Sequence, residues 1–273
     1  MRGAVHALTL VLAGCLLAGP AFARGPQVDS PRALIQHMAK GLPEVKVGQW
    51  VTYRVYGAHE LRTAFIRVGV AGEERDHLGR DAYWLDVEMA QHHKMRAPLM
   101  QARLLVAKNP KDGEEAITRA YFAWGAERVR EMTPEALAGV VEPKDPARHA
   151  SVAEPQDRAM DPSRSRITTG KEQRLLTLAG TVTAVPVEMR YGQVVLKRVW
   201  VSREVPILNL AKLEMPAIDH AIEVREYGAN FVSEMILPAP GQPKLGVEAF
   251  SDTPPQAESE GHDGHEEGGD HAP

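Results

Sequence analysis

The sequence predicts a mainly β protein, with some α structure, whose antiparallel strands form an incomplete or half β-barrel with short lid helices. Segments of alternating apolar and polar residues recur along the chain, which is the pattern of half-buried strands. The longest, residues 180–206, predicts two strands joined by a tight turn at residues 191–193. No stretch between successive strands suits a helical crossover, which argues against a parallel sheet.

Alternation also places the other strands. They are expected at residues 50–56, 64–71, 81–89, 100–107, 117–124, 173–178, 207–213 and 221–227, with 230–237 as a last strand or short helix. Pro186 falls inside the first strand of the long hairpin. Because proline cannot donate to a ladder, that strand is expected to lie at a sheet edge or to carry a bulge.

Two short helices are expected. Asp29 or Ser30 as cap with Pro31 in the first turn predicts a helix that ends at Gly41. Thr133 followed by Pro134 predicts a second helix start, with Thr133 as the capping residue. Both would pack an apolar stripe against the sheet and serve as lids.

The first 23 residues have the features of an export signal. Arg2 precedes an apolar run, and Ala21-Phe22-Ala23 forms a small-x-small cleavage site. We therefore expect residues 1–23 to be a signal peptide and the mature protein to be periplasmic. Leu12-Ala13-Gly14-Cys15 offers an alternative, because it is similar to a lipobox in which Cys15 is lipidated. Only that alternative implies membrane anchoring, and the association would be peripheral.

The remaining chain divides into one domain and a tail. Residues 24–237 are expected to form a single β-rich domain, with the proline-rich, charged stretch 142–166 as a mobile insertion. Residues 238–273 hold one lysine against eight acidic residues and are expected to be a disordered, acidic, His-rich tail. The formal net charge of −4 favours no nucleic-acid partner.

Three features of the layout carry a resemblance to a known family. They are the short first helix, the meander opening on Gln49-Trp50-Val51-Thr52-Tyr53, and the strand ending Val199-Trp200-Val201-Ser202-Arg203-Glu204-Val205-Pro206-Ile207. Together they resemble periplasmic lipoprotein carriers, the LolA/LolB-like superfamily. The resemblance spans roughly residues 30–237 and rests on layout. It implies an incomplete antiparallel barrel, lidded by helices, that holds acyl chains in its concavity. The partners it implies are a lipid or acyl chain and envelope lipoproteins.

No motif for enzymatic chemistry is present: the sequence lacks G-x-S-x-G, a P-loop, H-E-x-x-H and G-x-G-x-x-G. Asp86 and Glu88 could form an acid pair on one strand face, but a solvated face is the simpler interpretation. We therefore expect a non-enzymatic protein that binds a lipid or other apolar ligand. Alternation assigns the cavity wall to Val51, Tyr53, Val55, Phe65, Leu85, Val87, Leu105, Val187, Met189, Val199 and Val201.

No cofactor is expected for this role, but two alternative functions remain. In the tail, His262, His265 and His271 lie among carboxylates and could bind Zn²⁺, Ni²⁺ or Cu²⁺ weakly, as in a metal-buffering protein. His92-His93-Lys94-Met95 with Met100 could hold copper, although a polar loop is the preferred interpretation. A structural interaction module is the other alternative.

Overall fold

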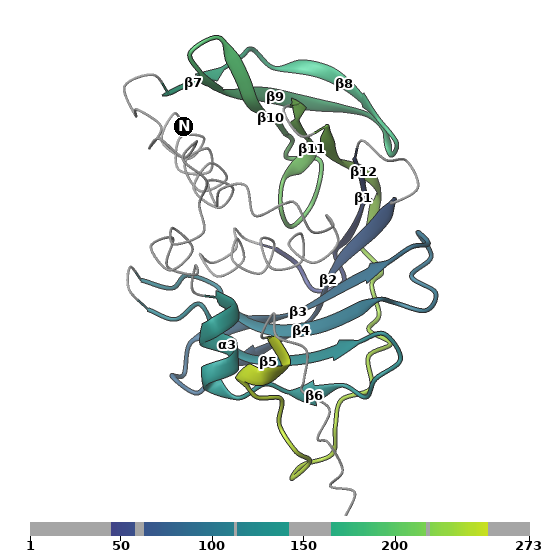
Figure 1. The fold of residues 1–273 in the computed structure, drawn as a ribbon, viewed down its shortest axis with the longest axis vertical. Coiled ribbons are helices and arrows are strands. Elements are labelled where there is room, and N and C mark those ends of the chain that lie inside the picture. The colour runs from purple at the N-terminus through teal and green to yellow at the C-terminus, as the bar shows by residue number, and fades with distance from the viewer. Residues whose placement is uncertain (1–44, 58–62, 112–113, 142–164, 217–218, 251–273) are drawn as a thin grey trace, which may run out of the picture.

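The computed structural model describes residues 45–57, 63–111, 114–141, 165–216 and 219–250. Over these residues the chain forms a twelve-stranded antiparallel sheet that does not close into a barrel (Figure 1). The predicted fold class is thereby confirmed. The predicted signal peptide, Cys15, the helix expected to end at Gly41 and the His-rich segment 251–273 all lie outside the described residues.

The sheet consists of two meanders that meet at its centre. The first contains β1 (Trp50–Gly57), β2 (Ala64–Arg75), β3 (Asp81–Ala90), β4 (Met100–Ala107), β5 (Ile117–Trp124) and β6 (Arg130–Glu131). The second contains β7 (Ser165–Thr169), β8 (Gln173–Thr177), β9 (Gly180–Tyr191), β10 (Val194–Val201), β11 (Leu210–Met215) and β12 (His220–Gly228). The strand order is β6-β5-β4-β3-β2-β1-β12-β11-β10-β9-β7, with β8 also paired to β9.

Most strands begin within a residue of the predicted positions, and three differences have local causes. β11 begins at Leu210 instead of residue 207, because residues 202–209 form a compact connection closed by a hydrogen bond from Ser202 N to Asn209 O (2.8 Å). β6 is two residues long, too short to show alternation. β7 starts at Ser165, so the predicted insertion 142–166 loses its last two residues to the sheet.

Pro186 lies in the sheet's interior, and the prediction that it marks an edge or a bulge is wrong. β9 pairs with β10 along one side, where Pro186 stands opposite Trp200. On its other side β9 changes partner, from β8 up to Ala184 to β7 from Val187 onward. Pro186 falls at that change, and its carbonyl accepts a hydrogen bond from Gly170 N (2.8 Å). The missing N–H donor therefore faces a break in the neighbouring ladder.

The predicted second helix is confirmed as α3 (Pro134–Val141). Thr133 caps it, because its Oγ1 accepts a hydrogen bond from Ala136 N (3.2 Å). The buried residues Ala136, Leu137 and Val140 form its apolar stripe. The helix packs on β5 and against the 3₁₀ helix η6 (Val247–Phe250).

Among the described residues after β12, the chain forms no further strand, so the strand or short helix expected at residues 230–237 is absent. Residues 229–246, here called the C-terminal strap, run from β12 back to β6 with a turn at residues 240–241 (Figure 1). The strap ends in a parallel bridge between Leu245 and Met132, and Leu245 is 3% exposed. The prediction of a disordered tail from residue 238 is therefore wrong for residues 238–250, because these residues belong to the fold.

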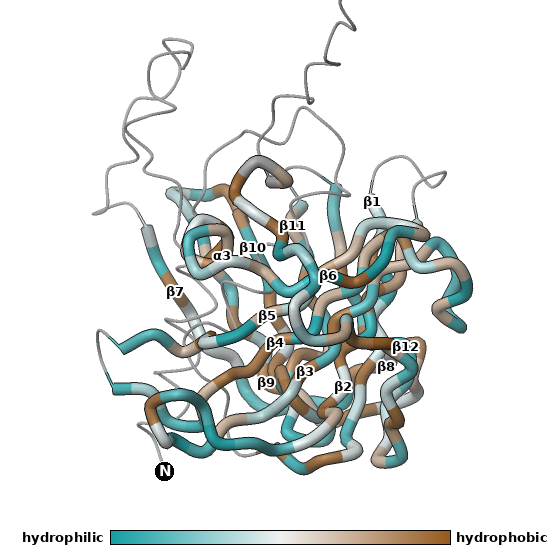
Figure 2. Tube along the Cα trace, turned by 90° about the horizontal axis from the view of Figure 1, so that it is seen from below, coloured by the Kyte–Doolittle hydropathy of each residue, from teal (hydrophilic) through white to brown (hydrophobic). Residues whose placement is uncertain are grey.

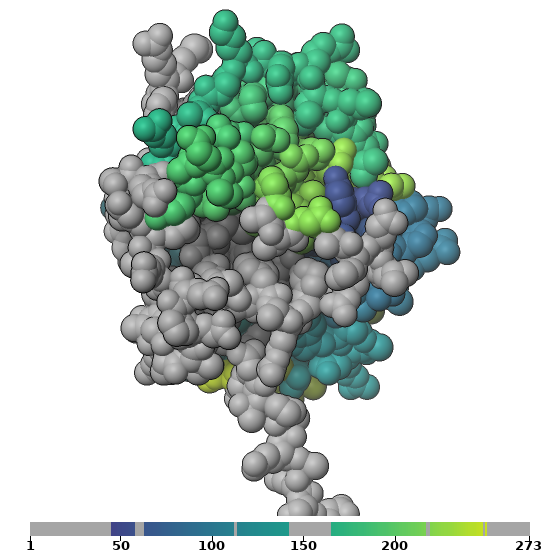
Figure 3. All heavy atoms as spheres, turned by 45° about the horizontal axis from the view of Figure 1, so that its top comes forward, coloured from purple at the N-terminus to yellow at the C-terminus, as the bar shows by residue number. Residues whose placement is uncertain are grey.

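The two faces of the sheet differ in character. Val51, Tyr53 and Val55 of β1 are buried on one face, here called the inner face, whereas Thr52 and Arg54 point to the outer face. Apolar stretches follow the strands and polar residues occupy most of the turns (Figure 2). In space-filling view the second meander, in green, and the first, in teal and blue, form opposite ends of the molecule (Figure 3).

Candidate functional site

The inner face is apolar across the central strands. Residues directly opposite each other in an antiparallel pair share a face, and the register places Val51 opposite Val68 and Val68 opposite Val87. All three are 0% exposed. The same face continues in the second meander, where Val55 of β1 stands opposite Ile222, Ile222 opposite Leu213, and Leu213 opposite Val199. The inner face is thus one apolar surface that spans both meanders.

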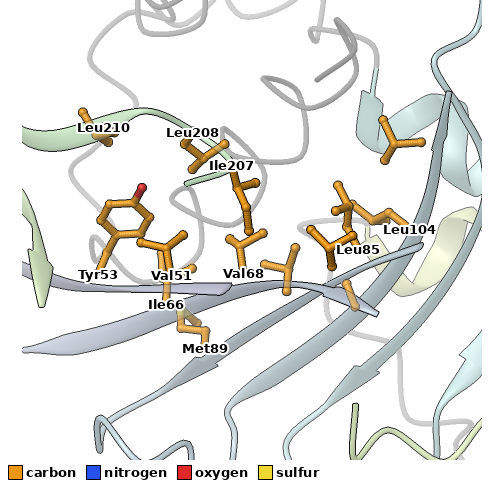
Figure 4. Packing of buried hydrophobic residues seen from close by; sticks show 14 of the residues in the cluster. Val51, Tyr53, Ile66, Val68, Leu85, Met89, Leu104, Ile207, Leu208 and Leu210 are labelled. Atoms are coloured by element: carbon orange, nitrogen blue, oxygen red, sulfur yellow. The ribbon is translucent and has the colours of Figure 1, made fainter. Parts of the chain in front are cut away.

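Nine of the eleven residues predicted to form the wall lie on the inner face by register. They come from four strands and are Val51, Tyr53, Val55, Leu85, Val87, Val187, Met189, Val199 and Val201. The predicted wall omits Ile66, Val68, Met89 and Leu104, which lie among them on the same face and belong to the hydrophobic core (Figure 4).

Phe65 and Leu105 lie on the outer face, so their predicted position is wrong. Phe65 stands opposite Arg54, and its ring lies 5.7 Å from the guanidinium carbon of Arg225. Leu105 stands opposite Trp84 and lies outside the main core cluster. Both occur in runs of consecutive apolar residues, where alternation does not indicate which face is buried.

The connection between β10 and β11 lies over the inner face. Val205, Ile207 and Leu208 are buried in it, and Figure 4 shows Ile207 and Leu208 on the side of the sheet that carries Val68 and Val51. Ile207 has φ of 67°, a value that strains a β-branched residue. The compact loop around Ile207 maintains this strained backbone conformation. The loop thereby places apolar side chains opposite the apolar inner face.

Buried polar groups interrupt this surface. Lys197 of β10 stands opposite Met189 and is 5% exposed. The Tyr53 side chain is 2% exposed, and its hydroxyl has no hydrogen-bond partner in the part of the chain that the structure describes. Burial raises the pKa of Tyr53 far above its usual range, so the phenol stays neutral. In Figure 4 the hydroxyl points away from β1 toward the segment that carries Leu208 and Leu210.

Asp86 and Glu88, expected on a solvated strand face, lie on the outer face, where Asp86 is buried. Asp86 is 2% exposed and accepts two hydrogen bonds from the Arg103 guanidinium, at 2.6 and 2.8 Å. Ser233 of the strap contacts both side chains. Burial raises the pKa of Glu88, against the opposing effect of Arg67. A bidentate ion pair under the strap fixes the Asp86 carboxylate and is a structural arrangement.

The two metal hypotheses gain no site among the described residues. His262, His265 and His271 lie beyond residue 250 and outside the described chain. His92 stacks on His93 at 4.5 Å between ring centroids, whereas Met100 is 1% exposed in the core on the inner face. Among the residues that the structure describes, no group of three His, Cys, Asp or Glu side chains is arranged to hold a metal ion.

Comparisons with known proteins give distant structural likenesses. No family model matches the sequence, and no curated protein matches it. A structure described as an exported protein with a YmcC-like fold, from Bacteroides fragilis, is 10% identical with a TM-score of 0.30, over 69% of this chain and 99% of that one.

Two further structures are similar at the same level. MucB is 10% identical with a TM-score of 0.31, over 80% of this chain and 63% of MucB. An outer membrane lipoprotein-sorting protein domain from Vibrio parahaemolyticus is 10% identical with a TM-score of 0.27, over 75% of this chain and 93% of that one. Likenesses this remote do not assign a family. In the described part of the chain, no helix has the length and apolar character needed to cross a membrane.

Proposed function

We propose that this protein is a non-enzymatic binding protein of the bacterial envelope that holds a lipid or other apolar ligand against the inner face of its sheet. The observation that carries the proposal is the apolar inner face, which spans both meanders and lies opposite an apolar loop. Ligand sites of this kind are concave and mostly apolar, with few polar groups. Removal of an acyl chain from water would supply the binding free energy, at about 0.8 kcal/mol per buried CH₂ group.

The envelope location rests on the N-terminal sequence, in which a basic residue, an apolar run and a small-x-small site precede Arg24. The non-enzymatic role rests on the residues available for chemistry. Asp86 is bound to Arg103, and the sequence carries no nucleophile motif. Neither the Asp86–Arg103 pair nor any sequence motif places a reacting group near the inner face. Hydrophobic burial with polar groups at the rim is the mechanism that the inner face supports.

The direct test is native mass spectrometry of the full-length protein purified from a periplasmic extract. We expect a population whose mass exceeds that of the mature chain by the mass of a lipid. A protein with only its own mass, after gentle purification from an extract that contains lipid, would contradict the proposal. The same spectrum shows whether the mature chain begins at Arg24 or retains Cys15 with acyl chains.

A pair of variants locates the bound ligand. Ala102 lies on the inner face at 0% exposure, and its neighbour Gln101 points to the outer face. Ala102→Phe would fill space on the inner face, so the folded variant should retain less lipid, whereas Gln101→Phe should retain as much as the wild type. Far-UV circular dichroism checks folding. If Ala102→Phe unfolds while Gln101→Phe folds, the inner face is a filled core and the proposal is wrong.

A further inference from the structure

Tyr53 places a hydroxyl group where an apolar core would not need one. Its register partners are Ile66 in β2 and Val224 in β12, both buried and apolar. Val51 and Val55 flank it on the same face of β1. A phenylalanine would fill the same volume without a polar atom, so the hydroxyl is not explained by packing.

The hydroxyl is also unsatisfied. Most buried polar side-chain atoms have a hydrogen-bond partner, and leaving one without a partner is unfavourable. The described residues supply no partner to the Tyr53 hydroxyl. A bound water needs two to four polar partners, roughly, and apolar surroundings do not offer them. Nearby backbone groups of β1 are engaged in the ladders to β2 and β12.

We propose that the Tyr53 hydroxyl donates a hydrogen bond to an acyl carbonyl oxygen, so that the inner face selects acyl esters or amides over plain hydrocarbons. This inference rests on the function proposed above and names its ligand class. A neutral phenol is a donor suited to a neutral carbonyl acceptor. A free carboxylate would instead bring a charge into apolar surroundings, which is strongly unfavourable.

The neighbouring tyrosine of the same strand provides a matched control. Tyr56 lies on the opposite face of β1, and its hydroxyl donates a hydrogen bond to Glu223 Oε2 (3.0 Å). Tyr53→Phe and Tyr56→Phe therefore remove the same atom from two faces of one strand. The first removes an unsatisfied hydroxyl, and the second removes a satisfied one.

The experiment measures displacement of 1-N-phenylnaphthylamine, a neutral apolar fluorophore, from the full-length protein by three competitors. These are methyl palmitate, N-methylpalmitamide and hexadecane, an ester, an amide and a hydrocarbon. We expect Tyr53→Phe to weaken competition by the carbonyl compounds by about five- to tenfold and to leave hexadecane unchanged. Tyr56→Phe should change none of the three. The stronger carbonyl competitor identifies whether ester-linked or amide-linked chains are preferred.

The outcomes separate this inference from the function on which it rests. If the fluorophore and all competitors fail to bind the wild type, the binding function is wrong and the inference falls with it. If all three compete equally and Tyr53→Phe alters none, the apolar site stands but the hydroxyl has no role in selectivity. Thermal unfolding gives a second readout: Tyr53→Phe should unfold no earlier than the wild type. A loss of stability equal to that of Tyr56→Phe would show that the hydroxyl has a partner within the protein.

Discussion

At the scale of single residues, the turn between β2 and β3 depends on the Asp76 carboxylate. Asp76 accepts hydrogen bonds from the backbone N of Leu78 and Arg80 (2.9 Å each) and from Arg80 Nε (2.7 Å). Burial alone would raise the pKa of Asp76, but the hydrogen bonds and the guanidinium charge outweigh it and lower the pKa. The ionised carboxylate therefore stabilises the folded state.

Asp76→Asn should lower the free energy of unfolding by about 1–3 kcal/mol at neutral pH. Because the folded-state pKa is depressed, the stabilisation is present above the ordinary Asp pKa and is lost as pH falls through the folded-state pKa. Urea denaturation at about pH 7 and at about pH 3 measures this difference, because Asp is mostly ionised at the higher pH and mostly protonated at the lower one in the unfolded chain. An equal deficit at both values would show that charge is not the cause.

Glu88 on the outer face should behave in the opposite way. Burial raises its pKa, so ionisation is less favourable in the folded protein than in the unfolded one. Stability should therefore fall as pH rises above the ordinary Glu pKa. Glu88→Gln should flatten this fall and leave stability at neutral pH equal or higher, as measured by thermal unfolding across pH. Glu115→Gln, at an exposed position, is the control. A clear loss of stability at neutral pH would mean that the attraction between Glu88 and Arg67 dominates.

At the scale of elements, the C-terminal strap determines how the outer face is covered. Phe231 packs on Gly69 of β2, where an added Cβ would lie 2.6 Å from the ring. Ser233, two residues on, reaches the Asp86–Arg103 pair. Val232, which lies between Phe231 and Ser233, is 80% exposed, and Ile236, further along the strap, is 86% exposed. Alternate strap residues thus contact the sheet, although the strap makes no ladder with it.

Gly69→Ala should displace the strap. The new methyl group overlaps the Phe231 ring, so we expect a loss of about 1–3 kcal/mol of stability and faster amide exchange in residues 231–235. Gly72→Ala on the same strand is the control, because its nearest contact would be Trp84 Cδ1 at 4.0 Å. If both variants exchange like the wild type, Phe231 is not what holds the strap to the sheet.

The strap also shows where sequence patterns stop being informative. Alternation located the long strands because each has one apolar face, and it gave β1 and β3 their correct inner residues. Residues 230–237 alternate as a strand does, yet their contacts are side chains on a sheet face, which no local pattern reveals. Leu105 and Phe65 were misplaced for a related reason: the outer face is itself partly covered, so both faces of β4 and β2 carry apolar residues. The unsatisfied hydroxyl of Tyr53 depends on tertiary neighbours and could not be predicted.

At the scale of the whole molecule, the sheet is two sequential meanders joined by one long-range pairing. β1 pairs with β12, placing Tyr53 opposite Val224 and Val55 opposite Ile222. Within each meander, every strand but β8 follows its chain neighbour across the sheet. Local pairings of this kind form early, whereas the central pairing closes a long loop. We therefore expect each meander to form its own pairings before the central pairing closes.

A cut between the meanders should leave the protein assembled. With a protease site engineered within residues 142–164, the cleaved chains should co-elute as one particle with an unchanged far-UV spectrum, because the β1–β12 pairing and the strap hold them together. Dilution in urea should then separate the two chains, and the midpoint should depend on protein concentration. Separation without denaturant would show that the central pairing is weak.

The bridge at Leu245 has a consequence for self-association. Leu245 N donates to Glu131 O (2.8 Å) and Thr133 N donates to Leu245 O (2.9 Å), so the strap occupies the free side of β6. Uncovered sheet edges recruit strands from other chains. A chain ending at Leu237, the natural truncation for removing the tail histidines, would also uncover this edge. Light scattering should show that such a variant forms oligomers. A variant that ends at Phe250 would remove the tail histidines and keep the edge of β6 covered, so it tests metal binding by the tail without exposing the edge.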